Sequence, residues 1–230
     1  MLASGMTSLS VVIPALDEET ALPRALGAAR QQGVVELLVV DGGSRDDTLG
    51  VARQLADRVL VAPRGRAAQM NAGAAVARGD VVLFLHADTL LPPGYPERVA
   101  GALATGAIGG RFDLRLDAPG LVYRGLERLI SLRSRLTGVA TGDQAIFVRR
   151  DVFERLGGYP PVPLMEDIAL CRRLKRAGRL VPLRDRVVTS ARRWQQHGVA
   201  RTVLLMWALR AGYYAGLSPD RLARLYADAR

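Results

Sequence analysis

Acidic residues gather in three short segments, each of which follows an apolar run. These segments are Pro14–Glu19, Asp41–Thr48 and His86–Thr89. Carboxylates that share a cleft repel one another and raise one another's pKa unless cations or hydrogen-bond donors compensate them. A divalent metal ion, together with the donors of a ribose and a base, would supply that compensation. The three segments are therefore candidates for a site that binds a nucleotide and a metal ion.

Several of these acids also allow a purely structural interpretation. Four of them stand close to the start of helical stretches: Asp17, Glu18, Asp46 and Asp47. A carboxylate at such a position can cap the helix and interact favourably with its dipole, and for Asp46 and Asp47 we favour this role. Asp41 and Asp88 fit it less well, because each comes at the end of an apolar run. These two are the stronger candidates for ligand binding.

The sequence around these segments alternates between strand and helix patterns. Short runs rich in valine, isoleucine and leucine predict strands at Leu9–Ile13, Val35–Val40, Arg58–Val61 and Val81–Leu85. Apolar residues at helical spacing predict helices at Thr20–Arg30, Asp46–Ala56 and Ala67–Arg78, several of them preceded by a residue able to cap. This order predicts an α/β fold with a mostly parallel sheet and helices on both faces. Ligands of such sheets bind beyond the carboxyl ends of the strands, where the acidic segments stand.

The charge distribution and the cysteine content indicate which class of partner and which cellular compartment to expect. The chain has 32 basic and 22 acidic residues, and 14 of the basic residues but only three acids lie between positions 170 and 230. This excess favours an anionic partner, either a membrane surface or a phosphorylated acceptor, with a solvated face as the alternative. No nucleic-acid-binding motif accompanies it. The single Cys171 and an N-terminus without a signal pattern predict a cytoplasmic protein, with peripheral contact at the inner face of the membrane left open.

Four motifs occur in a fixed order and spacing: Leu9–Glu19, Val39–Thr48, Gly65–Gly73 and Phe84–Thr89, followed by Met165–Asp167. Together they resemble the family 2 glycosyltransferases of the GT-A fold, over roughly residues 8 to 197. The resemblance implies a Rossmann-like sheet and inverting transfer of a sugar from a nucleoside-diphosphate sugar, UDP- or GDP-linked, to an acceptor hydroxyl. Ser190 stands where processive members carry glutamine, so processive synthesis is disfavoured. No glycine-rich dinucleotide loop or phosphate-loop lysine motif favours another class of nucleotide-binding protein.

The resemblance also implies a nucleotide site. Its expected residues are Pro14, Glu18, Asp41, Arg66, His86 and Asp88. Asp88 matches the last acid of the family's DxD motif, which holds Mn²⁺ or Mg²⁺ against the diphosphate. Histidine replaces the usual aspartate at position 86, so His86 either donates to the ribose or a phosphate or packs behind the site. His197 is the second candidate metal ligand, with an uninvolved surface histidine as the alternative, and imidazole would favour manganese.

Catalytic and acceptor-binding residues follow from the same resemblance. Asp167 is the expected general base, and Glu166 would orient it or the acceptor. The alternative is that both acids only cap the helix predicted at Ile168–Ala177. Gly110, Phe112 and Asp143 occupy positions where the family lines its acceptor pocket, and glycines there would let the backbone approach a sugar closely, although a structural turn is as good an explanation.

The C-terminal region has a different character from the rest of the chain. We expect a transferase domain at residues 1–197 and a basic, apolar helical extension at 198–230 packed on it. Arginines interrupt the apolar run Val199–Leu217, so it suits a membrane interface, a packing face or a homodimer contact better than a membrane span. A lipid-linked acceptor is therefore one option. The alternatives to a transferase are a sugar-phosphate nucleotidyltransferase and a non-catalytic module that binds membranes or polyanions.

Overall fold

The first half of the chain forms four parallel strands close to the predicted positions. The computed structural model describes residues 7–228, so most of the N-terminal stretch considered for a signal lies outside the described residues. The strands are β1 (Leu9–Ala15), β2 (Val34–Asp41), β3 (Arg58–Val61) and β4 (Val81–Phe84), in the order β3-β2-β1-β4. All three pairings are parallel. Every residue of β1 is buried, which explains its unbroken apolar sequence.

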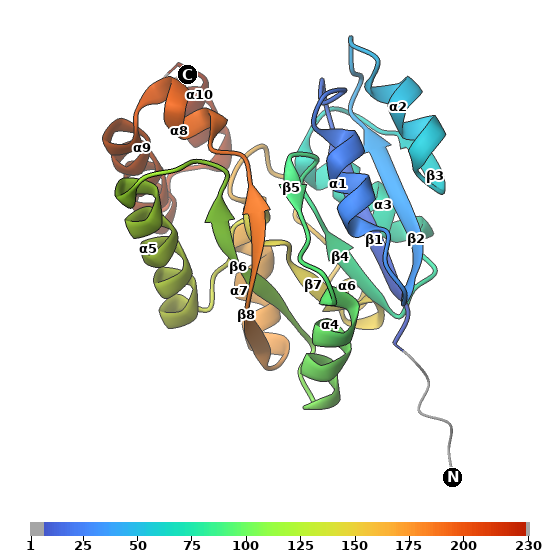
Figure 1. Ribbon diagram of the computed structural model, residues 1–230. Helices are drawn as coiled ribbons and strands as arrows, with labels where there is room; N and C mark the ends of the chain where they lie inside the picture. The colour runs from blue at the N-terminus through green and yellow to red at the C-terminus, as the bar shows by residue number, and fades with distance from the viewer. Residues whose placement is uncertain (1–6, 229–230) are drawn as a thin grey trace.

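Helices cover both faces of this sheet, as Figure 1 shows. The alternating side chains of β1 divide the core in two, with Val11 on one face and Val12 on the other. The Val11 face packs against α1 (Leu22–Ala29), α2 (Thr48–Leu55), α4 (Tyr95–Ala104) and α5 (Leu121–Thr137). The Val12 face packs against α3 (Arg66–Val76), α6 (Arg150–Arg155) and α7 (Glu166–Ala177). The α/β prediction with helices on both faces is confirmed.

The second half of the sheet is mixed. Its strands are β5 (Thr89–Leu90), β6 (Gly109–Leu116), β7 (Phe147–Arg149) and β8 (Leu180–Thr189), and the sheet order continues β4-β7-β6-β8-β5. β7 runs antiparallel to both β4 and β6, whereas β6 and β8 are parallel. The carboxyl ends of β6 and β8 therefore lie at the same edge of the sheet as those of β1 to β4. A short 3-10 helix, η1 (Gly142–Gln144), precedes β7.

Three helices follow β8: α8 (Arg192–His197), α9 (Val199–Tyr214) and α10 (Pro219–Asp228). Leu209 of α9 and Leu222 of α10 pack with Ile168 and Cys171 of α7 in a third apolar cluster. Figure 1 shows these helices beside α5, on the far side of the molecule from α2. Within residues 7–228, no helix is both long and apolar enough to cross a membrane.

Helix starts differ from the prediction in one respect. The N-cap residues of α1, α2 and α3 are Ala21, Asp47 and Gly65, and none makes a side-chain capping bond. Instead, Asp46 accepts the backbone N–H of Thr48 at 3.0 Å, one residue further back than a standard cap. Asp46 therefore has the structural role that the sequence favoured, whereas Asp47 does not cap α2 through its side chain.

Candidate active site

The loops after β1 and β2 are joined by their own acids. Asp17 accepts the backbone N–H of Arg45 at 2.7 Å, Glu19 accepts that of Asp47 at 2.8 Å, and Asp46 accepts that of Glu19 at 3.1 Å. These carboxylates hold the two loops against each other. They are thus engaged in structural contacts between the two loops. The carboxylates of Glu18 and Asp88, in contrast, accept no hydrogen bond from these loops among the described residues.

Asp41 is fully buried at the end of β2 and is bound by its own loop. Its Oδ2 accepts the N–H groups of Gly43 at 2.8 Å and Ser44 at 3.0 Å, and its Oδ1 accepts the hydroxyl of Ser44. These bonds fix the turn that follows the strand. The expected nucleoside contact of Asp41 remains a prediction, and the structure adds a loop-shaping role.

Gln69 is a site-shaping residue that the sequence reasoning did not single out. From α3 its buried Nε2 donates to the carbonyl oxygens of Ala15 and Val40, each at 2.8 Å, and so ties β1 to β2 at their carboxyl ends. A side chain on Gly42 would press against the Gln69 amide. In the sequence, only the position of Gln69 within the motif Gly65–Gly73 indicates a role at the site.

Glu18 and Asp88 lie close enough together to interact electrostatically. Burial raises the pKa of Glu18, and the negative charge of Asp88 raises it further. Burial likewise raises the pKa of Asp88, although the nearby Arg192 and Arg66 oppose the shift. Glu18 Oε1 lies 3.3 Å from Nη2 of Arg192, so α8 reaches back to the loop after β1. The structure therefore brings together two acids that are 70 positions apart in the sequence.

Arg66 supplies positive charge to this whole region. It begins α3 and is exposed, and its charge contributes to the pKa shifts of Glu18, His86, Asp88, Glu166 and Asp167. An exposed arginine among buried acids is suited to a diphosphate, because its N–H groups match phosphate oxygens. Arg66 therefore lies close to these acids, and its contact with a base or a diphosphate remains a prediction.

His86 is held against η1. Burial, with the charges of Arg66 and Arg193, places the pKa of His86 well below its usual value, so the imidazole is neutral. A Cβ at Gly142 would overlap this ring, so only glycine fits at position 142. Packing behind the site is thus an observed role of His86. A donated hydrogen bond to a nucleotide remains a prediction.

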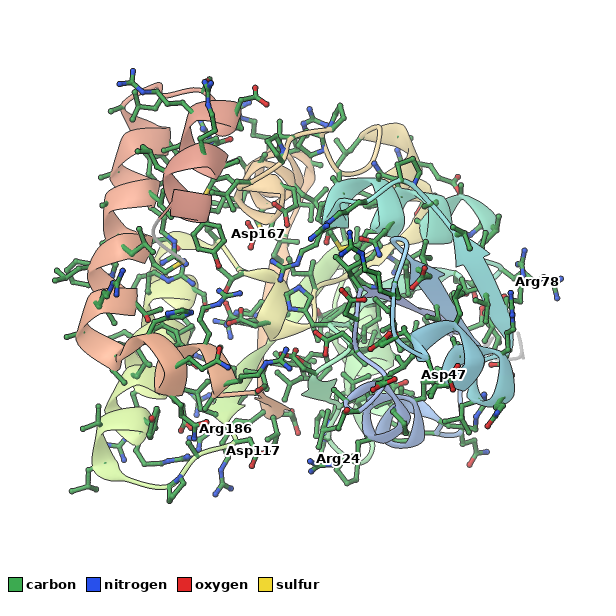
Figure 2. The ribbon with its side chains drawn as sticks, turned by 90° about the horizontal axis from the view of Figure 1, so that it is seen from above. Arg24, Asp47, Arg78, Asp117, Asp167 and Arg186 are labelled. Atoms are coloured by element: carbon green, nitrogen blue, oxygen red, sulfur yellow. The ribbon has the colours of Figure 1, made fainter. Side chains whose placement is uncertain are left out.

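Asp167 and Glu166 lie side by side in the first turn of α7. Asp167 accepts the N–H of Gly142 at 3.1 Å and that of Ile168 at 2.7 Å. Burial raises the pKa of both carboxyls, and for Glu166 the charge of Asp167 adds to it, bringing its pKa to about 7. Figure 2 shows Asp167 between the C-terminal helices and the N-terminal part of the sheet, whereas Asp47 lies away from it. Asp167 thus accepts one N–H of the first turn of its own helix, although the N-cap residue is Met165 and makes no side-chain capping bond. Its second bond ties α7 to η1.

The burial of Glu166 predicts a pH-dependent gain in stability for Glu166→Gln. The pKa of Glu166 is higher in the folded protein than in the unfolded chain. The free energy of unfolding of the wild type is therefore larger at pH 5 and decreases as the pH rises towards 7. We expect the glutamine variant to match the wild type at pH 5 and to be about 1 to 3 kcal/mol more stable at pH 8. Urea unfolding at the two pH values measures this. Equal stability of the two proteins at pH 8 would contradict the assigned burial.

A metal ion shared with a substrate fits Asp88. Its carboxylate takes part in no ion pair among residues 7–228, and its one hydrogen bond, from Thr89 Oγ1, is long at 3.4 Å. In the described part of the chain, no three His, Cys, Asp or Glu side chains form a group that could hold a metal ion by themselves. His197 ends α8, half-buried, and forms no such group with Asp88. The donors present therefore suit an ion whose other ligands are phosphate oxygens and water.

The acceptor residues divide into two kinds, which corrects part of the prediction. Phe112 is fully buried and contacts Phe147 edge-on at 5.8 Å between ring centroids. Gly110 lies inside the sheet, where a Cβ would overlap the carbonyl oxygen of Val181. These two residues serve the core, because β6 is a central strand, and we do not assign them to the acceptor. Asp143, in contrast, is near Asp88 and Asp167, since its charge raises the pKa of both.

A cavity of about 580 Å³ lies at the carboxyl edge of β6 and β8, the edge that also carries the acids. Its lining runs from Arg115 to Leu121, with Arg124 and Val188. Figure 2 labels Asp117 in this region, well separated from Asp167. The cavity is thus beside the crevice and not part of the acidic cluster.

The fold is that of a GT-A glycosyltransferase. The family model "Glycosyl transferase family 2" matches residues 10–157, and the chain belongs to that family. It is 35% identical over 157 residues to the undecaprenyl-phosphate 4-deoxy-4-formamido-L-arabinose transferase of Pseudomonas fluorescens, covering 61% of this chain and 46% of that protein. The chain thus spans about half the length of this relative. The glycosyltransferase class predicted from the sequence is confirmed.

Two solved structures share the fold. Staphylococcus aureus TarS (residues 1–349) in complex with UDP-GlcNAc has a TM-score of 0.64 at 17% identity, over 80% of this chain and 58% of that one. Glucosyl-3-phosphoglycerate synthase from Mycobacterium tuberculosis, in complex with Mn²⁺, UDP and glucosyl-3-phosphoglycerate, has a TM-score of 0.54 at 25% identity, over 78% of this chain and 70% of that one.

Proposed function

We propose that this chain transfers a sugar from a nucleoside-diphosphate sugar to an acceptor hydroxyl, with inversion, in a metal-dependent and non-processive reaction. The observation that carries this proposal is the pair Glu166 and Asp167, buried with raised pKa values and close to Arg66. Family membership and the UDP-bound structural neighbours support a nucleotide-sugar donor. The donor would bind at the carboxyl ends of β1, β2 and β4, where Glu18, Asp41, Arg66 and Asp88 lie, with Pro14 and His86 as further proposed contacts.

The residues divide the chemistry between them. Asp167 takes the proton of the acceptor hydroxyl as the oxygen attacks the anomeric carbon, and the raised pKa makes it a stronger base than an exposed aspartate. Arg66 offsets the charge of the departing diphosphate. Asp88, with His197 as the proposed second protein ligand, would hold Mn²⁺ or Mg²⁺, which supplies Lewis-acid stabilisation of the leaving group when bound. No covalent intermediate is needed, because direct displacement inverts the anomeric centre.

Hydrolysis of the donor tests this proposal without knowledge of the acceptor. We expect purified protein with Mn²⁺ to release UDP or GDP slowly from one member of a panel of nucleotide sugars, with water as a poor acceptor. Proton NMR of the first sugar released would show the anomer opposite to that of the donor. Release of the same anomer would contradict inversion, and release of a sugar 1-phosphate would indicate pyrophosphate-bond chemistry instead.

An anionic membrane surface is the proposed environment of the C-terminal half. Helices α5 and α9 lie on the same side of the molecule in both figures and expose large apolar side chains. Each of these is more than half exposed: Leu121, Leu129, Leu132, Leu136, Leu204 and Trp207. We call this set the apolar surface. The two helices carry six arginines and one acid, Glu127, which is buried, so the charge complements anionic lipid.

This surface predicts a lipid-binding defect in the double variant Leu129→Ser, Leu132→Ser. Wild-type protein should sediment with vesicles of phosphatidylcholine and phosphatidylglycerol. The variant should bind roughly a hundredfold more weakly, since two leucines that insert into lipid contribute about 3 kcal/mol. Val61→Ser, which alters an exposed residue of β3, is the matched control and should bind normally. If the wild type does not bind vesicles, and is a dimer where the double variant is a monomer, the apolar surface is instead a contact between two copies of the chain.

These proposals include the division of the chain. The transferase domain at residues 1–197 and the helical extension at 198–230 remain a proposed division of the chain, supported by the packing of α9 and α10 on α7.

A lipid-linked acceptor is supported by the name of the Pseudomonas relative, which includes undecaprenyl phosphate. Family membership sets aside the nucleotidyltransferase alternative.

A further inference from the structure

Arg133 of α5 has a buried guanidinium without a hydrogen-bond partner in the described part of the chain. Its Nε and Nη2 atoms are sealed from solvent and make no hydrogen bond. The ion pairs of α5 involve its neighbours Arg124 and Arg135 instead. An unpaired buried donor destabilises the folded protein, and more so when it is charged, so these atoms indicate a place where a ligand could supply the missing acceptors.

The loop around η1 places this guanidinium beside the catalytic region. Gly142 donates its N–H to Asp167 at 3.1 Å, and Gln144 donates from Nε2 to Ser134 Oγ at 3.0 Å. Asp143 therefore sits between the helix that bears Asp167 and the helix that bears Arg133. Its Oδ1 is also buried and unpaired, so two orphaned groups of opposite charge flank the same place.

A second guanidinium lies near the first. Arg210 of α9 and Arg111 of β6 lower the pKa of Arg133 and the carboxylates of Asp143 and Asp167 raise it, while burial dominates and brings it to about 10. Arg133 is therefore cationic at neutral pH. Arg111 is ion-paired with Asp113, which it shares with Arg135, whereas Arg133 and Arg210 repel each other. An anion between these two would relieve the repulsion and satisfy the free N–H groups.

We propose that Arg133 and Arg210 bind a phosphate group of the acceptor next to Asp167. This inference rests on the proposed function and specifies its acceptor as a phosphorylated compound. Two guanidiniums from separate helices can contact several oxygens of one tetrahedral anion, which suits phosphate. Asp143 Oδ1 is placed to accept a hydrogen bond from a hydroxyl of the same molecule. The phosphate belongs either to a lipid head group or to a soluble acceptor.

Anion titrations test this assignment. Protein saturated with Mn²⁺ and its nucleotide, so that the diphosphate site is filled, is titrated with inorganic phosphate and with decyl phosphate by calorimetry. We expect Arg133→Gln and Arg210→Gln each to weaken binding at least tenfold, and Arg133→Lys to keep part of it. Arg128→Gln, which removes an exposed arginine of the same helix, should bind as the wild type does. Tighter binding of decyl phosphate would identify a lipid acceptor, and equal binding a soluble one.

The outcomes separate this inference from the proposed function. Phosphate binding that is unchanged in both Arg133→Gln and Arg210→Gln, or weakened equally in Arg128→Gln, would overturn the anion site. Each variant should bind nucleotide within twofold of the wild type, which shows that it is folded. If no nucleotide binds the wild type, the proposed function fails. The comparison of Arg133 with Arg128 variants in nucleotide-free protein then still decides whether the anion site exists.

Discussion

Asp167→Asn is expected to lower the rate of sugar transfer by about 10²- to 10⁴-fold, because it removes the group that takes the acceptor proton. Asparagine has nearly the same shape and can still accept the N–H of Gly142 or of Ile168 through one oxygen. The loop before β7 should therefore stay in place. Nucleotide affinity should change little, since the loss falls on the transition state and not on donor binding.

Single-turnover kinetics with saturating donor measures this loss directly. The matched control is Asp151→Asn, which alters an exposed acid in the first turn of α6 and should leave the rate unchanged. A rate for Asp167→Asn within threefold of the wild type would remove Asp167 from the role of base. Glu166 would then be the next candidate, since its pKa is also raised.

Asp88→Asn should reduce turnover by about 10²- to 10³-fold and abolish its dependence on manganese concentration, because metal stabilisation of a leaving group contributes several kcal/mol. The effect has a structural basis: within the described region the carboxylate of Asp88 has neither an ion pair nor a short hydrogen bond, so its oxygens are available to a metal ion. Removal of its charge should also lower the pKa of Glu18 towards its usual value.

Turnover measured against manganese concentration distinguishes a metal ligand from a merely structural acid. Asp117→Asn is the control, because Asp117 is an exposed acid at the same edge of the sheet. If Asp88→Asn keeps the wild-type manganese response with a lower rate, Asp88 does not hold the ion. A fully retained rate would contradict the proposed donor site.

The parallel strands could be predicted because burial on both faces leaves a continuous apolar run. The ends of β1, β2 and β4 agree with the prediction to within two residues, and the acids that follow them do gather at one edge. β6 was not predicted as a strand. Its sequence contains Arg111 and Asp113, which read as surface residues until the structure shows that they neutralise each other inside the protein.

The site was predictable only where local sequence determines it. Glu18, Arg66, Asp88 and Asp167 stand in motifs, and the structure places them near one another. Gly110 and Phe112 were assigned to the acceptor by position alone, and nothing local reveals that β6 turns them towards the core. The same holds for Gln69, whose two bonds join strands far apart in the sequence. The buried position of Arg133 could not be predicted from the sequence, since an arginine on an amphipathic helix is normally exposed.

Calorimetric titration of UDP and of GDP into wild-type protein, with and without Mn²⁺, tests the central claim most directly. One of the two nucleotides should bind, and manganese should strengthen its binding at least tenfold. Asp88→Asn should abolish this manganese-dependent increase in affinity, whereas Asp167→Asn should retain it. Absence of binding by both nucleotides, or an affinity that manganese does not change, would contradict a metal-dependent nucleotide-sugar site at the carboxyl ends of β1, β2 and β4.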